Sequence, residues 1–284
     1  MPVMSSPAEH DKASSGNAFT GSIADLYDSH MVPLIFQPYA DDLVAELRTL
    51  APARILETAA GTGVVTRAMS RGLAANATIT ATDFNLPMLH RGMAVGTNLP
   101  VRYQYADAMR LPFPDASFDA VVCQFGAMFF PVKAQAFSEA RRVLRPGGVF
   151  LFNVWDRLVE NEFAEVVTDA VAAMFPGDPP VFLNRVPHGY YDLQLIQRDL
   201  SAGGFKGAPQ IRRGVPARSR AASPDIPAVA YVQGTPLRND IEVRDPARLG
   251  EATTAATEAI AARFGRGPVD GKIQAHVIAA FRER

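Results

Sequence analysis

The stretch RILETAAGTGVVTRAMS, residues 54–70, decides the fold of this chain. Its apolar start predicts a strand, its small residues a tight turn, and its end a helix. Gly61 and Gly63 allow the backbone to turn sharply and to approach a ligand without a Cβ in the way. The free N–H groups at the start of the helix would point at that turn and suit a carboxylate or phosphate. The alternative is a tight strand-to-helix turn that holds no ligand.

Short apolar runs alternate with amphipathic segments from residue 53 to residue 155, which is typical of a parallel α/β sheet. The runs are rich in Val, Ile, Phe and Tyr, which favour strands. The predicted strands cover 54–58, 77–83, 100–106, 118–125 and 148–155. The predicted helices between them cover 66–73, 86–95 and 132–144. Right-handed crossovers would place these helices on both faces of a doubly wound sheet.

The pattern loosens after Trp155. We predict irregular structure over 156–190 and 214–248, and helices over 191–202 and 252–264. A strand is predicted near 209–213, and residues 274–282 are predicted as a strand, with a helical end as the alternative. Four arginines lie between Ile211 and Ala221, a cluster that we interpret as a solvated loop rather than an anion site. The irregular stretches have the length and composition of substrate loops.

Acidic residues follow the second and third predicted strands. Asp83 comes 20 residues after Gly63, at the edge of the sheet where ligands bind, and could accept hydrogen bonds from two ribose hydroxyls. Asp107 could accept the exocyclic amine of adenine, with the Ala108 N–H offered to a ring nitrogen. A solvated turn at 83 and a loop cap at 107 are the alternatives. The dinucleotide fingerprint has a third glycine where this chain has Thr66, which counts against NAD.

Four segments in order, 55–64, 81–90, 106–125 and 143–156, resemble the motif series of class I S-adenosylmethionine-dependent methyltransferases. The likeness is to small-molecule members of the methyltransferase domain 11/25 type. Residues 27–41 also resemble the N-terminal helices of these members. It covers residues 20–155 well and the remainder loosely. The resemblance implies S-adenosyl-L-methionine as cofactor. It also implies a seven-stranded, mostly parallel sheet whose last strand is antiparallel between two others.

The resemblance also implies which residues hold the cofactor. These are Glu57, Ala59, Gly61, Gly63 and the backbone carbonyl of Gln124 for the methionine portion, Asp83 for the ribose, Phe84 and Met88 for packing on ribose and adenine, and Asp107 and Ala108 for the adenine edge. Ordinary core packing is the alternative for Phe84 and Met88. The family usually has glycine at the position of Ala59, whose methyl group would lie against the methionine tail. Tyr27 and Tyr39 would either close over the cofactor or pack as parts of amphipathic helices.

The reaction that the resemblance implies needs few catalytic side chains. A sulfonium methyl group is already activated, so its transfer needs a linear arrangement, and a base only for a protonated acceptor. We assign no catalytic set. His188, beside Tyr190 and Tyr191, is the candidate base, with a packing histidine as the alternative. Cys123 lies within an apolar strand and is expected to be a small core residue, and no spacing of His, Asp or Glu predicts a metal site.

Composition excludes several function classes. The 284 residues include 28 Lys and Arg and 29 Asp and Glu, a net charge of −1, which disfavours a nucleic-acid partner. One cysteine excludes an intramolecular disulfide and a multi-cysteine metal cluster. No apolar stretch approaches the ~20 residues of a membrane span, and residues 1–18 lack a signal-peptide pattern and are expected to be disordered. A cytoplasmic protein is therefore expected.

We expect one domain over 19–284, with a cofactor-binding core at 41–155 and cap or substrate segments at 19–40, 156–192 and 214–270. The predicted function is methyl transfer to a small organic acceptor by in-line displacement. One alternative is a module that binds the cofactor without turnover, and a less favoured one is an NAD-linked dehydrogenase. The sequence leaves open the acceptor, its reacting atom (O, N, C or S) and the choice between monomer and homodimer.

Overall fold

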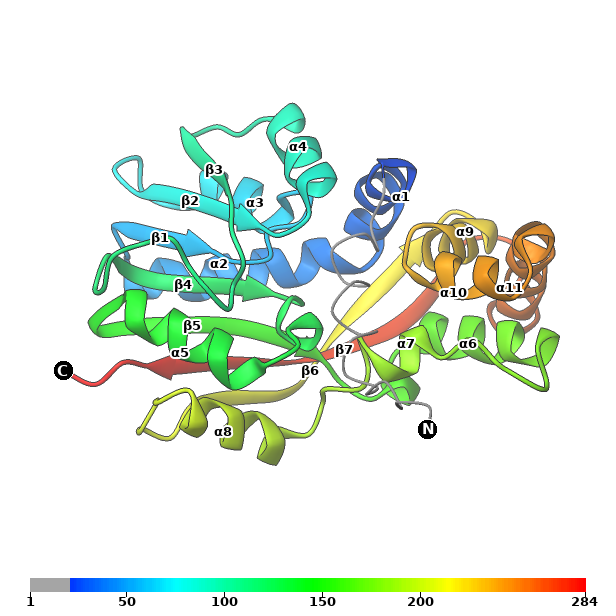
Figure 1. Ribbon diagram of the computed structural model, residues 1–284. Coiled ribbons are helices and arrows are strands. Elements are labelled where there is room, and N and C mark those ends of the chain that lie inside the picture. The colour runs from blue at the N-terminus through cyan, green and yellow to red at the C-terminus, as the bar shows by residue number, and fades with distance from the viewer. Residues whose placement is uncertain (1–20) are drawn as a thin grey trace, which may run out of the picture.

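The computed structural model describes residues 21–284, so the expected disorder of residues 1–18 lies outside the described part. A seven-stranded sheet in the order β3-β2-β1-β4-β5-β7-β6 forms the centre (Figure 1). The strands are β1 (Arg54–Glu57), β2 (Thr78–Asp83), β3 (Val101–Tyr105), β4 (Phe118–Gln124), β5 (Leu144–Trp155), β6 (Gln210–Ala221) and β7 (Val269–Phe281). β1 to β5 pair in parallel, whereas β7 is antiparallel to both β5 and β6. This confirms the doubly wound, mostly parallel sheet with its antiparallel last strand.

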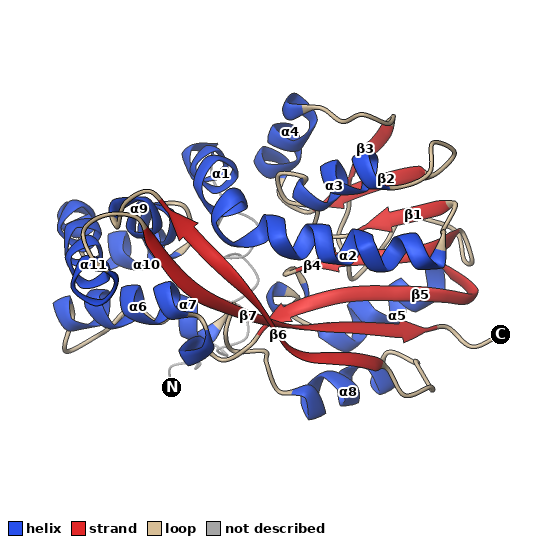
Figure 2. Ribbon diagram, turned by 180° about the vertical axis from the view of Figure 1, so that it is seen from behind, coloured by secondary structure: helices blue, strands red, loops and turns tan. Residues whose placement is uncertain are grey.

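Helices cover both faces of the sheet. They are α2 (Gln37–Leu50), α3 (Val64–Gly72), α4 (Leu86–Val95), α5 (Lys133–Val143) and α8 (Leu193–Ala202). α2 and α3 lie on one face, and α5 and α8 lie on the other (Figures 1 and 2). The central strand β4 has four consecutive fully buried residues, 120–123. Side chains alternate between the two faces of a strand, so such an unbroken apolar run is stable only where both faces are covered.

A second group of helices gathers beyond one end of the sheet, beside the long ends of β6 and β7 (Figure 1). They are α6 (Glu162–Met174), α7 (Phe182–Arg185), α9 (Asp225–Gln233), α10 (Leu237–Arg244) and α11 (Leu249–Phe264). The short helix α1 (Gly21–Leu26) contacts both α4 and α9. Short 3₁₀ turns lie at Ala127–Phe129, Leu158–Glu160 and Pro246–Arg248. We call α6, α7, α9, α10 and α11 the helical cap.

The prediction of irregular structure over 156–190 and 214–248 was wrong, because both stretches contain helices. In α6, Phe163, Val167 and Val171 follow helical spacing on the buried side. The proline-rich residues 176–180 after it concealed this pattern. α9 packs against α6, α11 and the N-terminal segment, and most of its side chains are buried. A helix buried on most sides has no amphipathic period for sequence analysis to detect.

The arginine cluster between 211 and 221 was also interpreted wrongly, since it lies in the edge strand β6 rather than in a loop. Arg212 pairs with Asp42 of α2 at 2.5 Å. Arg218 and Arg220 both pair with Asp270 of β7, at 2.7 and 3.1 Å. Charged side chains on an edge strand discourage pairing with another chain. These arginines therefore stabilise the edge of the sheet through ion pairs.

Residues Tyr27–Phe36 join α1 to α2 through a π-helical segment that contains Pro33. A proline inside a helix has no N–H to donate, and its ring crowds the preceding turn. Wider turns of this kind occur in helices most often at functional sites. The segment buries Met31, Ile35 and Phe36 at the end of the sheet. It thereby brings Phe36 to the glycine loop and places Met31 and Ile35 in the neighbouring cavity.

Candidate active site

The turn between β1 and α3 has an unusual backbone. Ala59, Gly61 and Gly63 have φ values of +51°, +56° and +82°. Glycine adopts these angles freely, whereas a Cβ is strained there. The Ala60 N–H donates to the Thr82 carbonyl at 2.9 Å, which ties the loop to β2. Ala59 therefore has a backbone conformation that favours glycine, which is the usual residue at this position in the family that the sequence resembles.

Glu57, at the end of β1, lies beneath this loop and is 2% exposed. Its Oε2 accepts a hydrogen bond from the Thr66 hydroxyl of α3 at 2.5 Å, and its carbonyl accepts one from the Thr82 hydroxyl at 2.8 Å. Burial raises the pKa of Glu57 to about 8, although the Thr66 hydrogen bond and the charge of Arg67 oppose the shift. A cation bound nearby would therefore strongly favour its ionised form.

Asp83, at the end of β2, is held by backbone N–H groups. Its Oδ2 accepts from Gly61 and its Oδ1 from Asn85, both at 2.7 Å. Each oxygen keeps a further lone pair that a ligand hydroxyl can use. Burial raises the pKa of Asp83, and these backbone donors oppose the shift. The Asn85 side chain accepts from the Met88 N–H at 3.1 Å and so begins α4.

The two predicted packing residues lie differently. Met88 is buried, and its terminal methyl carbon lies 4.0 Å from the point that a Cβ on Gly61 would occupy. Phe84 is 47% exposed and its ring centre lies 5.3 Å from that of Tyr105. Met88 is therefore part of the wall beneath the loop. Phe84 presents an open ring next to Asp83.

Asp107 and Ala108 follow β3 in a short turn. The Asp107 Oδ1 accepts from the Met109 N–H at 2.8 Å, and its carbonyl accepts from the Arg110 N–H at 2.9 Å. β3 is the edge strand next to β2. The Ala106 N–H donates to the Asp83 carbonyl at 3.1 Å. This turn therefore lies beside Asp83, which places both predicted acidic residues at one edge of the sheet.

A cavity of about 290 Å³ lies at the glycine loop. We call it the glycine-loop cavity; its lining includes Tyr27, Phe36, Glu57, Ala59, Gly61, Thr62 and Gln124. The Gln124 Nε2 donates to the Phe36 carbonyl at 3.3 Å. The Gln124 Oε1 and the Thr62 hydroxyl are buried and have no hydrogen-bond partner within residues 21–284. Buried polar atoms are rarely left unpaired, so these two indicate a place for a polar ligand.

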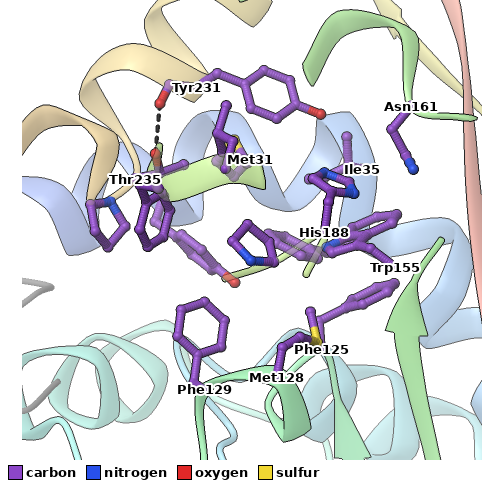
Figure 3. A pocket seen from close by; sticks show the side chains of 16 residues that line it. Met31, Ile35, Phe125, Met128, Phe129, Trp155, Asn161, His188, Tyr231 and Thr235 are labelled. Carbon is purple, nitrogen blue, oxygen red and sulfur yellow. Dashed lines mark hydrogen bonds between the residues drawn. The ribbon is translucent and has the colours of Figure 1, made fainter. Parts of the chain in front are cut away.

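A second cavity, of about 540 Å³, lies between the sheet and the helical cap (Figure 3). We call it the aromatic cavity, and its aromatic lining is Tyr27, Phe36, Phe125, Phe129, Trp155, Phe182, His188 and Tyr231. Phe125 and Trp155 stack with ring centres 3.8 Å apart. Tyr27 and Phe36 line both cavities. The polar loop and the aromatic cavity therefore share a wall.

His188 is buried in the wall of the aromatic cavity. Burial lowers its pKa to about 4, although its interactions with Asp156 oppose the shift. The imidazole is therefore neutral at physiological pH. The sequence predicts His188 as a candidate base within a substrate segment. It does not predict that Phe125, Trp155 and Tyr231 line the same cavity. Aromatic residues in apolar strands and helices give no sign in the sequence that they converge.

Two further predicted residues belong to the core. The Tyr39 hydroxyl donates to the Val215 carbonyl at 2.8 Å, and its ring meets Phe125 and Trp155 edge-on. Tyr39 thus packs between α2 and the sheet, so the packing alternative applies. Cys123 is fully buried in β4, and burial raises its pKa to about 12. A thiol in such surroundings is unreactive.

Within residues 21–284, no cluster of three His, Cys, Asp or Glu side chains is arranged to hold a metal ion. The same part of the chain has no helix that is long and apolar enough to cross a membrane.

Comparisons of the sequence with known proteins identify relatives of this chain. The family described as "Methyltransferase domain" matches residues 56–152. A demethylmenaquinone methyltransferase of Deinococcus radiodurans is 34% identical over 172 residues, which cover 59% of this chain and 68% of the relative. One of Thermus thermophilus is 45% identical over 115 residues, covering 40% of this chain and 48% of the relative. The matched regions therefore span about half to two thirds of these relatives.

Solved structures share the fold. The YcgJ protein of Bacillus subtilis has a TM-score of 0.53 at 19% identity, covering 86% of this chain and 99% of that one. Phosphoethanolamine N-methyltransferase 2 of Haemonchus contortus has a TM-score of 0.57 at 15% identity, covering all of this chain and 62% of that one. Fold, loop geometry and relatives agree, and this chain belongs to the class I methyltransferases, whose cofactor is S-adenosylmethionine.

Proposed function

We propose that this enzyme transfers a methyl group to a small, largely apolar aromatic acceptor that binds in the aromatic cavity. The observation that carries the proposal is the wall shared by the two cavities, formed by Tyr27 and Phe36. A cofactor at the glycine loop and an acceptor in the aromatic cavity would lie next to each other beside these side chains. The relatives named as demethylmenaquinone methyltransferases support an acceptor with an aromatic ring system.

The residues of the glycine-loop cavity fit the cofactor. Glu57 offers a buried carboxylate, and Thr62 and Gln124 offer buried polar atoms that lack partners within residues 21–284. A Cβ at Gly61 would lie at an ordinary contact distance of 4.0 Å from Met88, so the φ of +56° is what favours glycine in this loop. We assign the methionine portion to Glu57, Ala59, Gly61, Gly63 and Gln124, the ribose to Asp83, the ring contacts to Phe84 and Met88, and the adenine edge to Asp107 and Ala108.

S-adenosylmethionine supplies an activated methyl group on a sulfonium sulfur when bound. The chain's own residues provide position and exclusion of water. Phe125 and Trp155 stack face to face and form a rigid aromatic pair in the cavity wall, against which an aromatic acceptor can pack. The buried Met31 and Ile35 close the cavity from the N-terminal side. Holding two reactants in line contributes much of the rate in such displacements, about 7–11 kcal/mol in favourable cases.

The division of the chain follows the same proposal. We assign cofactor binding to residues 41–155 and the shaping of the acceptor cavity to segments 19–40, 156–192 and 214–270, of which the structure describes residues 21 onward. The second segment contributes Leu183 and His188, and the third contributes Tyr231. Residues 19–40 contribute Tyr27 and Phe36 to both cavities. Acceptor choice would then depend on these segments together with Phe125 and Trp155 of the core, and cofactor binding mainly on the core.

Calorimetry with S-adenosylhomocysteine tests the cofactor site. We expect binding by the wild type and a loss of at least tenfold in affinity for Asp83→Ala. Asp119→Ala is the matched control, because Asp119 accepts from the Ala53 and Arg54 N–H groups at the opposite end of β1. Unchanged affinity in Asp83→Ala would contradict the assigned site.

Mass spectrometry after incubation with S-adenosylmethionine tests the acceptor. Phenols, quinols and aromatic amines should gain one methyl group, and aliphatic amines or carboxylates of equal size should not. Replacing Phe125 or Trp155 by alanine should remove this preference, because the stacking surface is lost. Methylation of aliphatic acceptors only would contradict the proposal. Cofactor binding without methylation of any acceptor would favour a binding module instead.

A further inference from the structure

We propose that the acceptor carries a hydroxyl group, and that His188 and Tyr231 bind this hydroxyl together, with His188 as hydrogen-bond acceptor and Tyr231 as donor. The inference rests on the proposed function, because it names the polar group that the aromatic cavity selects. Both residues come from the helical cap and its adjoining loop, outside residues 56–152 matched by the family. The pair is thus a property of this chain's cap.

The hydrogen bonds of His188 define its tautomer. The Nδ1 lies 2.9 Å from the carbonyl oxygen of Asp156. Because a carbonyl oxygen only accepts, Nδ1 carries the hydrogen and donates it. The ring is neutral, so Nε2 keeps a lone pair. Within residues 21–284 no side chain or backbone group donates to this lone pair.

The carbonyl that orients His188 is itself held in place. The Asp156 Oδ2 accepts from the Gln274 Nε2 at 2.7 Å, and its Oδ1 lies 3.4 Å from the His276 Nε2. The His276 Nδ1 accepts from the Gly214 N–H at 3.0 Å, so its Nε2 is the nitrogen that carries hydrogen. The Asn161 amide donates to the same Asp156 carbonyl at 3.4 Å. This buried network keeps His188 in one orientation.

Tyr231 supplies the complementary donor. It is 3% exposed in α9, and burial is the only influence on the pKa of its hydroxyl, which makes no hydrogen bond within the described part of the chain. Figure 3 shows this hydroxyl pointing toward the part of the cavity where His188 and Asn161 lie. Burial raises the pKa of Tyr231, so the phenol stays protonated and donates.

The neighbouring polar groups are already engaged. The Thr235 hydroxyl donates to the Tyr231 carbonyl at 2.7 Å and accepts from the Leu237 N–H at 3.2 Å. The Asn161 amide donates to backbone carbonyls, and its Oδ1 accepts from the Gln274 N–H at 3.0 Å. Within the described residues 21–284, an acceptor and a donor without hydrogen-bond partners therefore stand out in an apolar cavity. A hydroxyl satisfies both, because it donates one hydrogen bond and accepts another.

A ligand without a hydroxyl leaves these buried groups unpaired, which is costly. Sites built to hydrogen-bond a hydroxyl therefore discriminate strongly against analogues that lack it. We expect the wild type to bind 1-naphthol at least about tenfold more tightly than 1-methylnaphthalene, which can neither donate to the His188 Nε2 nor accept from the Tyr231 hydroxyl. Calorimetry on the full chain, with and without S-adenosylhomocysteine, measures both affinities.

Two variants test the pair. His188→Asn keeps an N–H for the Asp156 carbonyl but removes the acceptor at Nε2, and Tyr231→Phe removes only the hydroxyl. Each should weaken 1-naphthol binding and reduce the preference to about threefold or less, with little effect on 1-methylnaphthalene, which makes neither hydrogen bond. Met128→Leu, a volume-conserving change in the same cavity, should leave the preference intact.

The inference is overturned if the wild type shows no preference for 1-naphthol or does not bind it. It is also overturned if the preference persists in Tyr231→Phe, a nearly isosteric variant that should fold even where His188→Asn does not. If the wild type methylates none of the acceptors but still prefers 1-naphthol, only the proposed function is overturned. Turnover of aromatic amines in place of phenols would overturn only the hydroxyl pair.

Discussion

Binding of the cofactor should release a proton from Glu57 at neutral pH. In the free protein, burial raises the pKa of this carboxyl to about 8. S-adenosylhomocysteine carries an ammonium group, which in the proposed site lies near Glu57. A positive charge within a few ångströms in a buried site favours the carboxylate and lowers its pKa again. The proton held in the free state then leaves when the ligand binds.

The size of the effect follows from the pKa. At pH 7 a carboxyl with a pKa of about 8 is about 90% protonated. If the bound state has an ordinary glutamate pKa of about 4.3, close to 0.9 proton is released per ligand at pH 7 and about 0.1 at pH 9. The affinity for S-adenosylhomocysteine should accordingly rise nearly tenfold per pH unit between about pH 5 and pH 8.

Calorimetry in phosphate and in Tris at pH 7 measures the released proton, because the two buffers differ in ionisation enthalpy. Glu57→Gln keeps a hydrogen-bonding side chain of the same size but has no proton to release, so its signal should not depend on the buffer. Thr66→Val is the matched control, because it removes the hydrogen bond to Glu57 but keeps the carboxyl. Release below about 0.2 proton by the wild type, or equal release by Glu57→Gln, would refute the reasoning.

Three further outcomes are expected. Ala59→Gly should raise the free energy of unfolding by roughly 0.5 kcal/mol, since relief of the left-handed alanine is partly offset by chain entropy; a measured loss in urea unfolding would contradict the assigned strain. Asp28→Ala should cost about 2 kcal/mol in the same assay, because Asp28 pairs with Arg67 and Arg91 at 3.0 Å and thereby holds the N-terminal segment to α3 and α4. Asp28→Asn removes the charge but keeps a hydrogen-bonding side chain, so it should lose most of the same free energy, and a negligible loss would rule out a charge effect. The pKa of His188 is depressed in the folded state, so folding favours the neutral imidazole. Its contribution to the free energy of unfolding is therefore present above pH 6.5 and is lost as the pH falls toward about 4, by about 3 kcal/mol in total. His188→Asn should flatten that part of the stability–pH curve, and an unchanged slope would show that another group causes it.

The cofactor end of the site was predictable because its residues follow from local pattern. Glu57 and Asp83 end adjacent parallel strands, and Gly61 and Gly63 lie between the first strand and its helix. Parallel strands present their carboxyl ends at one edge of the sheet, so spacing alone brings these residues together. The loop conformation of Ala59 was not predictable, because nothing in the local sequence requires an alanine at positive φ.

The helical cap was not predictable in the same way. α9 is buried on most sides and shows no amphipathic period, and the proline-rich segment 176–180 obscured the pattern of α6. Both stretches were predicted to be irregular. Their helical form depends on packing between α6, α9 and α11, which lie far apart in the sequence.

The sequence by itself determined the strands and crossover helices of residues 54–155, the glycine loop and the acidic residues at the strand ends, because each follows from a local pattern of residues; the seven-stranded order, which pairs β5 with the distant β7, followed only from the resemblance to a family. Only the tertiary structure decided the aromatic cavity. Its walls come from the π-helical segment, the ends of β4 and β5, α7 and α9, as Phe36, Phe125, Trp155, Leu183 and Tyr231 show. Hydrophobic burial has no direction, so an apolar residue's sequence position does not specify which distant partners it meets.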